Sequence, residues 1–229
     1  MTHISSDAKL QQIAIIGAGG CGRDLLVIVD AINDVKLTFN MLGFVVDSQY
    51  GQPGTLVNDK PILGDFSWIE QNPGVHLICG VGSPRDRRKL VIRAQEYGAT
   101  FCTLIHPHAV IPPRIEVGHG TAIAAGSIFT NRIRIGNHVH INLATTISHD
   151  CILEDFVTVS PGVHCSGNVT LNEGCFIGMG TNIIEKLNVG HWSTVGAGST
   201  IIMDVPNNAT VLGVPGKVQK TKKTGWYLD

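Results

Sequence analysis

The residues best suited to chemistry are a histidine and an aspartate side by side, His149 and Asp150. An adjacent carboxylate can orient an imidazole ring and stabilise the charge that the ring gains with a proton. Such a pair can remove a proton from an amine or a hydroxyl while that group attacks a carbonyl carbon. We therefore take His149 and Asp150 as candidate catalytic residues.

A second candidate site is a glycine-rich turn that runs from residue 17 to residue 22 and reads G-A-G-G-C-G. It follows a short buried-strand pattern at residues 13–16 and precedes an apolar stretch with helical spacing at 25–32. In a strand, turn and helix of this kind, the glycines let backbone N–H groups approach a diphosphate at the helix N-terminus. The candidate substrate-binding residues are Gly17, Gly19, Gly20, Cys21 and Gly22.

The elements around this turn predict a short Rossmann-like domain over residues 1–104. Residues 43–47 read as a second strand with Asp47 at its end, residues 75–79 as a third, and residues 100–104 as a fourth. A helix follows Ser83-Pro and runs to about residue 97. The usual ligand of the glycine motif is NAD, but about four strands leave no second half for the nicotinamide. A mononucleotide that carries a sugar fits this unit better.

The rest of the chain follows a six-residue repeat. An aliphatic residue, or a Phe or Cys in its place, stands at Ile105, Ile111, Val117, Ile123, Phe129, Ile135, Ile141, Ile147, Leu153, Val159, Cys165, Leu171, Ile177, Ile183, Val189, Val195 and Ile201. Six is even and suits strand alternation, whereas an amphipathic helix would lose the phase within two steps. Each unit is too short to bury its apolar residue alone, so the units must stack as a β-solenoid. A β-sandwich would instead show turns every 8–12 residues and a broken register.

The repeat also predicts which residues stack on the candidate base. Three hexapeptides make one coil of 18 residues, so His149 stacks about 4.8 Å from Gly167 on one side and Asn131 on the other. A glycine at that position exposes a backbone N–H beside the candidate base. The register leaves no room for a protruding loop between residues 105 and 201. The remaining histidines that we considered are expected to have surface or structural roles: His3 in a tail, His76 in a strand, His106 and His108 at the domain junction, and His119, His138 and His191 on solvated corners.

Composition limits the possible partners. The 229 residues carry a formal charge of −1 with scattered Lys and Arg, which argues against nucleic acid. No apolar run approaches the roughly 20 residues of a membrane span. The polar first residues lack a signal-peptide profile, so we expect a cytoplasmic protein. The six cysteines show no C-x-x-C spacing, Cys165 occupies a core position of the repeat, and we expect no metal.

The repeat pattern, aliphatic-small-x-x-small or β-branched-x, resembles the hexapeptide-repeat acyltransferase superfamily. Together with the glycine-rich domain in front of it, the chain resembles the nucleotide-sugar N-acetyltransferases of the bacillosamine and perosamine pathways and the related sialic-acid O-acetyltransferases. The resemblance implies a left-handed parallel β-helix over residues 105–229 that binds acetyl-CoA. It also implies that the N-terminal domain binds a sugar nucleotide, and that the product serves surface glycan or lipopolysaccharide biosynthesis.

The resemblance also assigns roles to residues. The stretch from Ser160 to Asn168 matches the motif S-P-G-x-x-x-x-G-N, which implies that His149 is the general base, Asp150 its orienting partner and Gly167 a backbone donor to the thioester carbonyl. The other implied acetyl-CoA contacts are Gly196, Ala197 and Lys217, the last within a G-x-P-G-K ending. Lys220, Lys222 and Lys223 could either meet the CoA phosphates or form a solvated basic tail. The implied sugar-nucleotide contacts are Asp47, Ser83, Arg87, Asn142 and His164.

Two positions depart from the family pattern. Cys21 stands where relatives usually have histidine, so a sugar contact there would differ. Thr158 stands where several relatives have a second active-site histidine, which argues against a two-histidine mechanism.

We therefore expect an acetyl-CoA-dependent N-acetyltransferase that acts on an amino group, at C4, of a nucleotide-linked sugar. The resemblance implies a homotrimer with CoA between neighbouring prisms and an active site shared by two chains. One alternative is a sialic-acid or polysaccharide O-acetyltransferase. Another is a non-enzymatic or metal-dependent solenoid protein, for which a three-histidine site would be expected, although no such triplet stands out. The sequence does not identify the nucleobase or the hexose.

Overall fold

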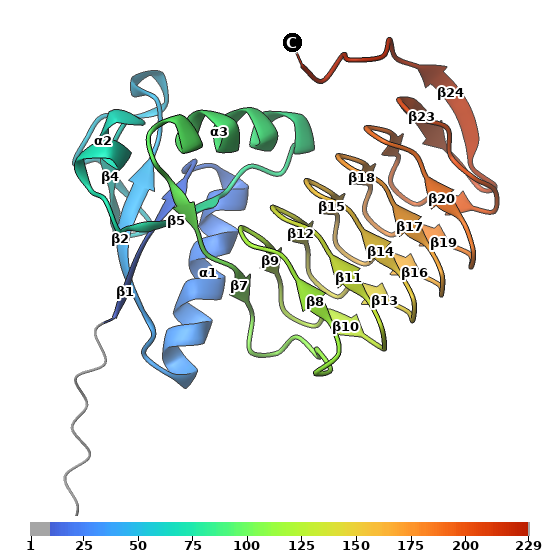
Figure 1. Ribbon diagram of the computed structural model, residues 1–229, viewed down its shortest axis with the longest axis horizontal. Helices are drawn as coiled ribbons and strands as arrows, with labels where there is room; N and C mark the ends of the chain where they lie inside the picture. The colour runs from blue at the N-terminus through green and yellow to red at the C-terminus, as the bar shows by residue number, and fades with distance from the viewer. Residues whose placement is uncertain (1–9, 229) are drawn as a thin grey trace, which may run out of the picture.

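The computed structural model describes residues 10–228, which form an α/β domain and a parallel β-helix in contact with each other (Figure 1). His3 and the N-terminal tail lie outside the described residues. The α/β domain contains a six-stranded sheet in the order β3-β4-β2-β1-β5-β6. Its strands are β1 (Gln11–Ile16), β2 (Phe39–Val45), β3 (Leu56–Val57), β4 (Lys60–Gly64), β5 (His76–Cys79) and β6 (Thr100–Phe101).

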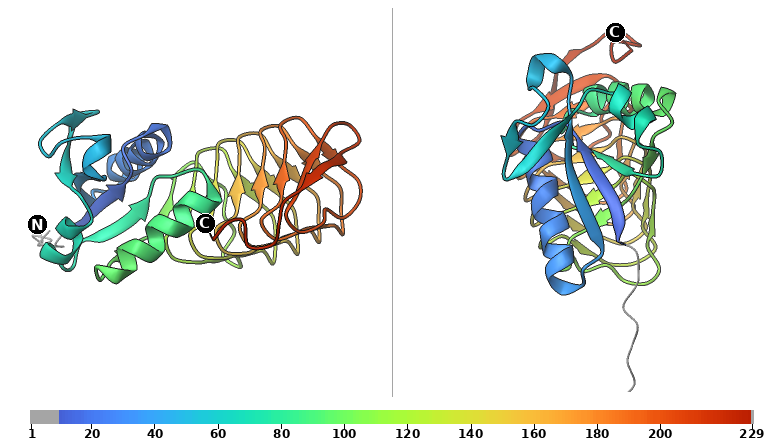
Figure 2. Two further views of the ribbon diagram at one scale, coloured as in Figure 1. Left: turned by 90° about the horizontal axis from the view of Figure 1, so that it is seen from above. Right: turned by 90° about the vertical axis from the view of Figure 1, so that its left-hand side faces the viewer.

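Helices cover both faces of this sheet (Figure 2). Helix α1 (Gly20–Val35) packs on one face, and α2 (Ser67–Gln71) and α3 (Pro84–Glu96) pack on the other. A 3₁₀ turn, η1 (Ser48–Tyr50), follows β2. The predicted strands and helices are all present, whereas β3, β4 and α2 were not predicted. The fourth predicted strand ends earlier than expected, because the chain leaves this sheet after Phe101 and enters the β-helix at Leu104.

The β-helix is a triangular prism with three parallel sheets as its faces. Face 1 contains β7 (Leu104–Ile105), β9 (Ala122–Ile123), β12 (His140–Ile141), β15 (Thr158–Val159), β18 (Phe176–Ile177), β21 (Thr194–Val195), β23 (Ala209–Leu212) and the antiparallel β24 (Lys217–Thr221). Face 2 contains β10 (Ile128–Phe129), β13 (Thr146–Ile147), β16 (His164–Cys165), β19 (Asn182–Ile183) and β22 (Thr200–Ile201). Face 3 contains β8 (Glu116–Val117), β11 (Arg134–Ile135), β14 (Ile152–Leu153), β17 (Thr170–Leu171) and β20 (Asn188–Val189).

The six-residue repeat determines this prism. The second residue of each short strand is a residue of the repeat, and the pairs follow at a constant step of 18, as in Ile141 with Val159 and Ile147 with Cys165. The repeat residues from Ile123 to Ile201 are buried in one continuous core. At the turns, small residues let neighbouring coils touch: a Cβ on Gly178 would lie 2.5 Å from the backbone nitrogen of Ala197. The predicted solenoid, its register and the absence of an inserted loop are therefore confirmed.

The two domains are joined by a buried arginine, Arg87, which has no exposed surface. Its Nε donates to the carbonyl oxygen of His138 at 2.9 Å, and its Nη2 donates to that of Phe156 at 2.8 Å and to the hydroxyl of Thr158 at 2.9 Å. Its Nη1 donates to the carbonyl oxygen of Val81 at 2.9 Å. All three nitrogens are thus used: Nε and Nη2 hold α3 against the β-helix, and Nη1 binds the loop that precedes α3. The prediction that Arg87 contacts the nucleotide is wrong for this reason.

His138 was predicted to lie on a solvated corner and is instead 3% exposed. Its ring stacks on Phe156 and meets the edge of Phe101, with ring centroids 5.2 and 4.7 Å away. The corner is covered because the α/β domain packs there, which a repeat pattern alone does not reveal. His119 and His191 are exposed, as expected.

The C-terminal segment turns back along the β-helix toward α3 after β24 (Figures 1 and 2). The ring of Tyr227 stacks on Trp192 with centroids 4.1 Å apart. The ammonium group of Lys222 lies 3.2 Å from the centroid of Trp226. This part of the basic tail therefore packs on aromatic rings, while Lys220 and Lys223 remain exposed.

Candidate active site

The His149–Asp150 pair lies in the turn between β13 of face 2 and β14 of face 3. Nδ1 of His149 lies 2.8 Å from one carboxylate oxygen of Asp150, and the other oxygen pairs with Arg132 at 2.7 Å. The hydrogen bond with His149 and the charge of Arg132 lower the pKa of Asp150, so the group is a carboxylate at neutral pH. A carboxylate only accepts hydrogen bonds, so Nδ1 carries the proton and Nε2 is the acceptor. With 58% of the His149 side chain exposed, this Nε2 is available to a substrate.

Gly167 lies directly against this imidazole, one coil further along the prism. A Cβ at this position would be 2.5 Å from Cε1 and 2.7 Å from Nε2 of His149. Within the described part of the chain, the backbone N–H of Gly167 has no hydrogen-bond acceptor, while its carbonyl accepts from Lys186. A base and a free backbone donor thus stand side by side. This arrangement can take a proton from a nucleophile and stabilise an oxyanion on the carbon that it attacks.

The glycine-rich turn forms an open helix N-terminus. Helix α1 starts after Gly19 with no side-chain cap and no acidic residue in its first turn. A Cβ on Gly22 would overlap the carbonyl oxygen of Gly17, and one on Gly80 would lie 2.5 Å from the Cα of Gly22. The backbones of the turn and of the segment after β5 are thus in contact. Uncapped N–H groups and the positive end of the helix dipole suit a phosphate group.

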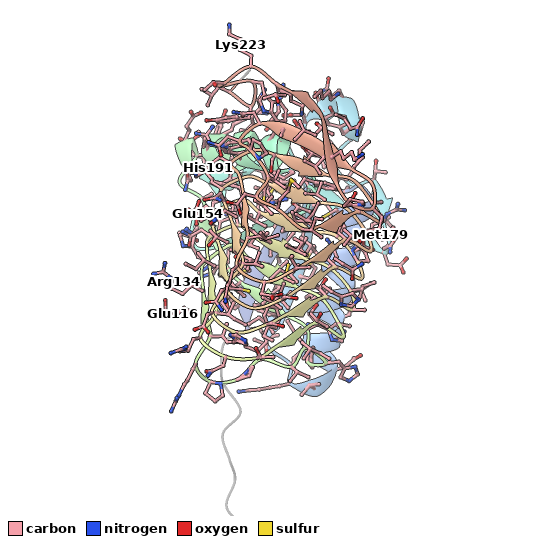
Figure 3. The ribbon with its side chains drawn as sticks, turned by 90° about the vertical axis from the view of Figure 1, so that its right-hand side faces the viewer. Glu116, Arg134, Glu154, Met179, His191 and Lys223 are labelled. Atoms are coloured by element: carbon pink, nitrogen blue, oxygen red, sulfur yellow. The ribbon has the colours of Figure 1, made fainter. Side chains whose placement is uncertain are left out.

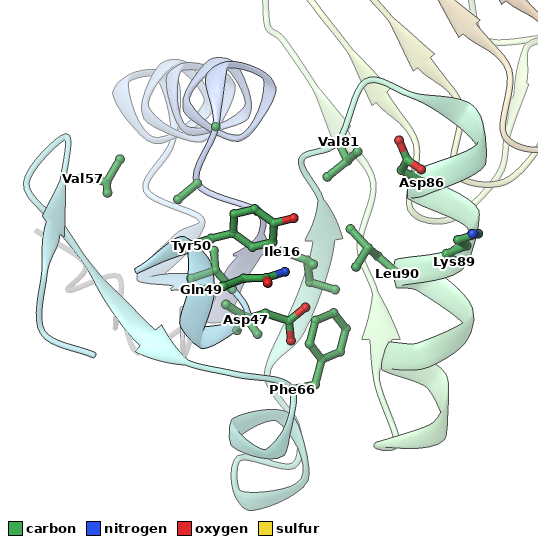
Figure 4. Close-up of a pocket in the computed structure, with 15 residues that line it drawn as sticks. Ile16, Asp47, Gln49, Tyr50, Val57, Phe66, Val81, Asp86, Lys89 and Leu90 are labelled. Carbon is green, nitrogen blue, oxygen red and sulfur yellow. The ribbon is translucent and has the colours of Figure 1, made fainter. Parts of the chain in front are cut away.

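A cavity of about 610 Å³ opens beside this turn, lined by Gly17, Gly19, Asp47, Tyr50 and residues of α3, among others (Figure 4). The two carboxylate oxygens of Asp47 lie 2.9 Å from Nη1 of Arg93. The Arg93 guanidinium in turn lies 4.0 Å from the ring centroid of Phe66. Asp47 is therefore held in place at the cavity wall, where it can accept hydrogen bonds from a nucleoside.

A smaller cavity of about 170 Å³ lies on the other side of the turn, between α1 and the β-helix. Its polar lining residues are Cys21, Asp24, His106, His140 and Asn142, and the others are apolar. The amide of Asn142 donates to the carbonyl oxygen of Val159 at 2.9 Å. Sequence reasoning missed His140, although its place directly before the core residue Ile141 marks it as facing outward from face 1. The structure shows that the α/β domain covers it there.

The remaining predicted site residues lie elsewhere. Ser83 accepts a hydrogen bond from the N–H of Asp86 at the start of α3 and lines a separate cavity of about 320 Å³ with Trp192 and Trp226. His164 is exposed on face 2, and its Nδ1 is 2.7 Å from the hydroxyl of Thr146. Gly196 and Ala197 lie at the edge between faces 1 and 2, and the exposed Lys217 begins β24.

The candidate residues therefore gather at two different edges of the prism. Asn142 and Ala197 lie at the edge between faces 1 and 2, and Cys21 in the glycine-rich turn approaches the same edge. His149 and Gly167 lie at the edge between faces 2 and 3. The whole of face 2 separates these groups within one chain.

Within residues 10–228, no group of three or more His, Cys, Asp or Glu side chains is placed to hold a metal ion. None of the helices in this part of the chain is long and apolar enough to cross a membrane.

A glycine-rich α/β domain joined to a parallel β-helix with an exposed His–Asp pair defines a class, the acetyltransferases built on hexapeptide repeats. Known proteins of this class are similar to the chain over both of its domains. The family model of the PglD N-terminal domain matches residues 12–94. GDP-perosamine N-acetyltransferase of Escherichia coli O157:H7 is 27% identical over 219 residues, which are 92% of this chain and 97% of that protein.

Solved structures agree with these matches over both domains. The acetyltransferase domain of PglB from Neisseria gonorrhoeae, in complex with acetyl coenzyme A, is 30% identical with a TM-score of 0.80, over 91% of this chain and 99% of that one. PerB from Caulobacter crescentus, in complex with CoA and GDP-perosamine, is 27% identical with a TM-score of 0.82, over 91% of this chain and 97% of that one. The chain belongs to the nucleotide-sugar N-acetyltransferase family of hexapeptide-repeat acetyltransferases. The predicted fold class is confirmed.

Proposed function

We propose that the protein transfers the acetyl group of acetyl-CoA to the C4 amino group of a nucleotide-linked amino sugar, with His149 as the general base. The observation that carries the proposal is the His149–Asp150 pair beside the free N–H of Gly167. The relatives solved with CoA, acetyl coenzyme A and GDP-perosamine support the choice of both substrates.

In the proposed reaction, the amine nitrogen attacks the thioester carbonyl carbon while Nε2 of His149 takes one of its protons. Asp150 stabilises the resulting imidazolium through Nδ1, and the Gly167 N–H donates to the oxyanion. The tetrahedral intermediate then breaks its C–S bond, and CoA leaves as a thiolate that the imidazolium can protonate. The product is an amide, and the enzyme returns to its starting state without a covalent intermediate.

The sugar nucleotide in this proposal is held by the α/β domain. The diphosphate lies at the N-terminus of α1, and the nucleoside enters the 610 Å³ cavity beside Asp47. The sugar then extends past Cys21 toward Asn142. Acetyl-CoA lies along the edge between faces 1 and 2 of the prism. Gly196 and Ala197 contact its pantetheine there, and Lys217 contacts the adenine end of the molecule. Because the donor is acetyl-CoA, we place the reaction in the cytoplasm.

The separation of the two edges supports a homotrimer. If face 2 of each chain turns toward a three-fold axis, the edge between faces 1 and 2 of one chain meets the edge between faces 2 and 3 of the next. Asn142 and Ala197 of one chain would then face His149 and Gly167 of its neighbour. Acetyl-CoA would lie between the two prisms, and each active site would use two chains.

Exposed apolar residues support face 2 as this contact surface. They lie on face 2 and along its two edges, as in Ile128, Leu143, Met179, Ile184 and Ile202, each at least 39% exposed. Met179 lies on the side of the prism opposite Glu116 and Arg134 of face 3 (Figure 3). A surface of this kind is typical of a subunit interface.

The test is acetyl transfer by the whole protein, measured as thiol release from acetyl-CoA with UDP-, GDP- and dTDP-linked 4-amino sugars and with free sialic acid. We expect activity with at least one 4-amino sugar nucleotide and a loss of at least a hundredfold in His149→Ala. The control is His191→Ala, because His191 is also an exposed corner histidine near a carboxylate, 3.8 Å from Glu154. Activity with sialic acid alone would favour the O-acetyltransferase instead. Near-normal activity of His149→Ala would reject the base.

A further inference from the structure

Cys21 differs from the other five cysteines of the chain. It is partly exposed, whereas Cys79, Cys102, Cys151, Cys165 and Cys175 are buried. It lies in the first turn of α1, within the glycine-rich segment, and its Sγ is 3.6 Å from Nδ1 of His140 on face 1. This contact joins residues 119 positions apart and links the phosphate-binding turn of one domain to the wall of the other.

Both members of the contact are neutral at physiological pH. Burial raises the pKa of the Cys21 thiol to about 11 and lowers the pKa of His140 well below its ordinary value. A neutral thiol is a weak donor and a weak acceptor, and a neutral imidazole carries one N–H and one acceptor nitrogen, so the tautomer of His140 decides which of Sγ and Nδ1 donates. His140 is 3% exposed, so the contact is covered from solvent on the side of the β-helix.

The partner of Cys21 lies at the edge of the prism that is proposed to hold the sugar. His140 is two residues before Asn142, and in the proposed trimer this edge faces His149 of the neighbouring chain. Further along α1, Leu25 and Ile28 pack in one cluster with Leu104 and Ala122 at the start of the β-helix. The body of the helix is thus held by apolar contacts, and the Cys21–His140 contact ties its first turn to face 1 of the β-helix.

We propose that Cys21 and His140 form a positioning pair, which fixes the glycine-rich turn beside Asn142 so that the amino group of the bound sugar reaches the general base of the neighbouring chain. This inference rests on the proposed function. The sugar would cross the 170 Å³ cavity that both residues line, so a shift of the turn moves the amine directly. A misplacement of about 1 Å in a reacting group can lower a rate by about a hundredfold. The diphosphate, in contrast, is bound by backbone N–H groups that move together with the turn.

The test separates positioning from binding. In Cys21→Ala and in His140→Leu we expect kcat to fall about tenfold, because either change releases the first turn of α1. The dissociation constants of GDP, UDP and dTDP, measured by calorimetry, should change less than about threefold. The double variant should be no slower than either single variant, because one contact is lost in all three. Cys21→Ser and His140→Asn, which keep a donor and an acceptor, should recover part of kcat.

Cys102→Ala is the matched control. Its thiol lies at the same distance, 3.6 Å, from the carbonyl oxygen of Leu77 to which it donates, but it does not line the cavity, so kcat should stay within about twofold of the wild type. Wild-type kcat in Cys21→Ala, or single effects that multiply in the double variant, would overturn the positioning pair. A fall in nucleotide affinity as large as the fall in kcat, together with a lower melting temperature, would also overturn it, in favour of a purely structural contact. Failure of the wild type to acetylate any sugar nucleotide would instead reject the proposed function, and the binding data would show whether the turn still holds a nucleotide.

Discussion

The sharpest consequence of the active-site geometry concerns Gly167→Ala, which adds one methyl group against the catalytic ring. The new Cβ would lie 2.5 Å from Cε1, 2.7 Å from Nε2 and 3.0 Å from Nδ1 of His149, whereas ordinary contact begins at 3.4 Å. The imidazole would therefore have to move by 3.4 − 2.5 = 0.9 Å. It can do so because its side chain is 58% exposed.

A displacement of this size predicts a fall in kcat of about a hundredfold, or about 2.7 kcal/mol in activation free energy. The KM for the sugar nucleotide should change little, since the groups proposed to bind its nucleotide lie on the α/β domain. The free energy of unfolding should change by less than about 1 kcal/mol. The reason is that the backbone of Gly167 lies outside the left-handed region, so alanine can adopt it.

The assay is thiol release at saturating acetyl-CoA and varied sugar nucleotide, with denaturant unfolding measured alongside. Ser166→Ala is the control, because it changes the same turn but brings no atom toward the ring. A Gly167→Ala protein with more than about a third of wild-type kcat would refute the reasoning. It would mean that the position of the ring beside Gly167 does not matter for the reaction.

Two further predictions concern the seam between the domains. Arg87→Met leaves the carbonyl groups of His138 and Phe156 without their buried donor, so the free energy of unfolding in urea should fall by at least about 3 kcal/mol. The control Arg88→Met changes a partly exposed side chain and should lower it by less than about 1 kcal/mol. Equal losses in the two variants would contradict the role of Arg87. Burial lowers the pKa of His138 to about 4, below the ordinary value of 6.5, so the unfolded chain takes up its proton first as the pH falls. Stability should therefore decrease from pH 6.5 toward pH 4, by up to about 1.4 kcal/mol per pH unit for this group, and His138→Phe should flatten the decrease. Phe156 shows that the equivalent position of the next coil accepts that ring, and an unchanged pH dependence would count against the assignment.

Much of the fold was predictable because its signals are local. The repeat identifies one buried core residue in every hexapeptide from Ile123 to Ile201, and its step of 18 places Gly167 against His149 without any knowledge of the other domain. The glycine-rich turn was predictable for the same reason, since the approach of Gly22 to Gly17 needs residues without a Cβ. These features depend on a few neighbouring residues or on a strict period.

The errors and omissions fall where the two domains meet. Arg87 looked like a ligand contact, and His138 like a solvated corner, because nothing in either stretch indicates what covers it. His140 has the same sequence context as other outward residues before a core position, such as Thr146 and Ile152, yet it alone of these three is buried beside the glycine-rich turn. Contacts between residues more than 50 positions apart, such as that of Arg87 with His138, leave no periodic signal.

The sequence by itself determined the prism, its register, the candidate base with its neighbouring glycine, and the phosphate-binding turn, because period and steric limits act along the chain. Only the tertiary structure decided which face of the prism the α/β domain covers, and with it the burial of Arg87, His138 and His140. It also decided that the glycine-rich turn approaches one edge of the prism and His149 occupies another. The physical reason is that the docking of two folded domains depends on the fit of whole surfaces, and a surface exists only after both domains have folded.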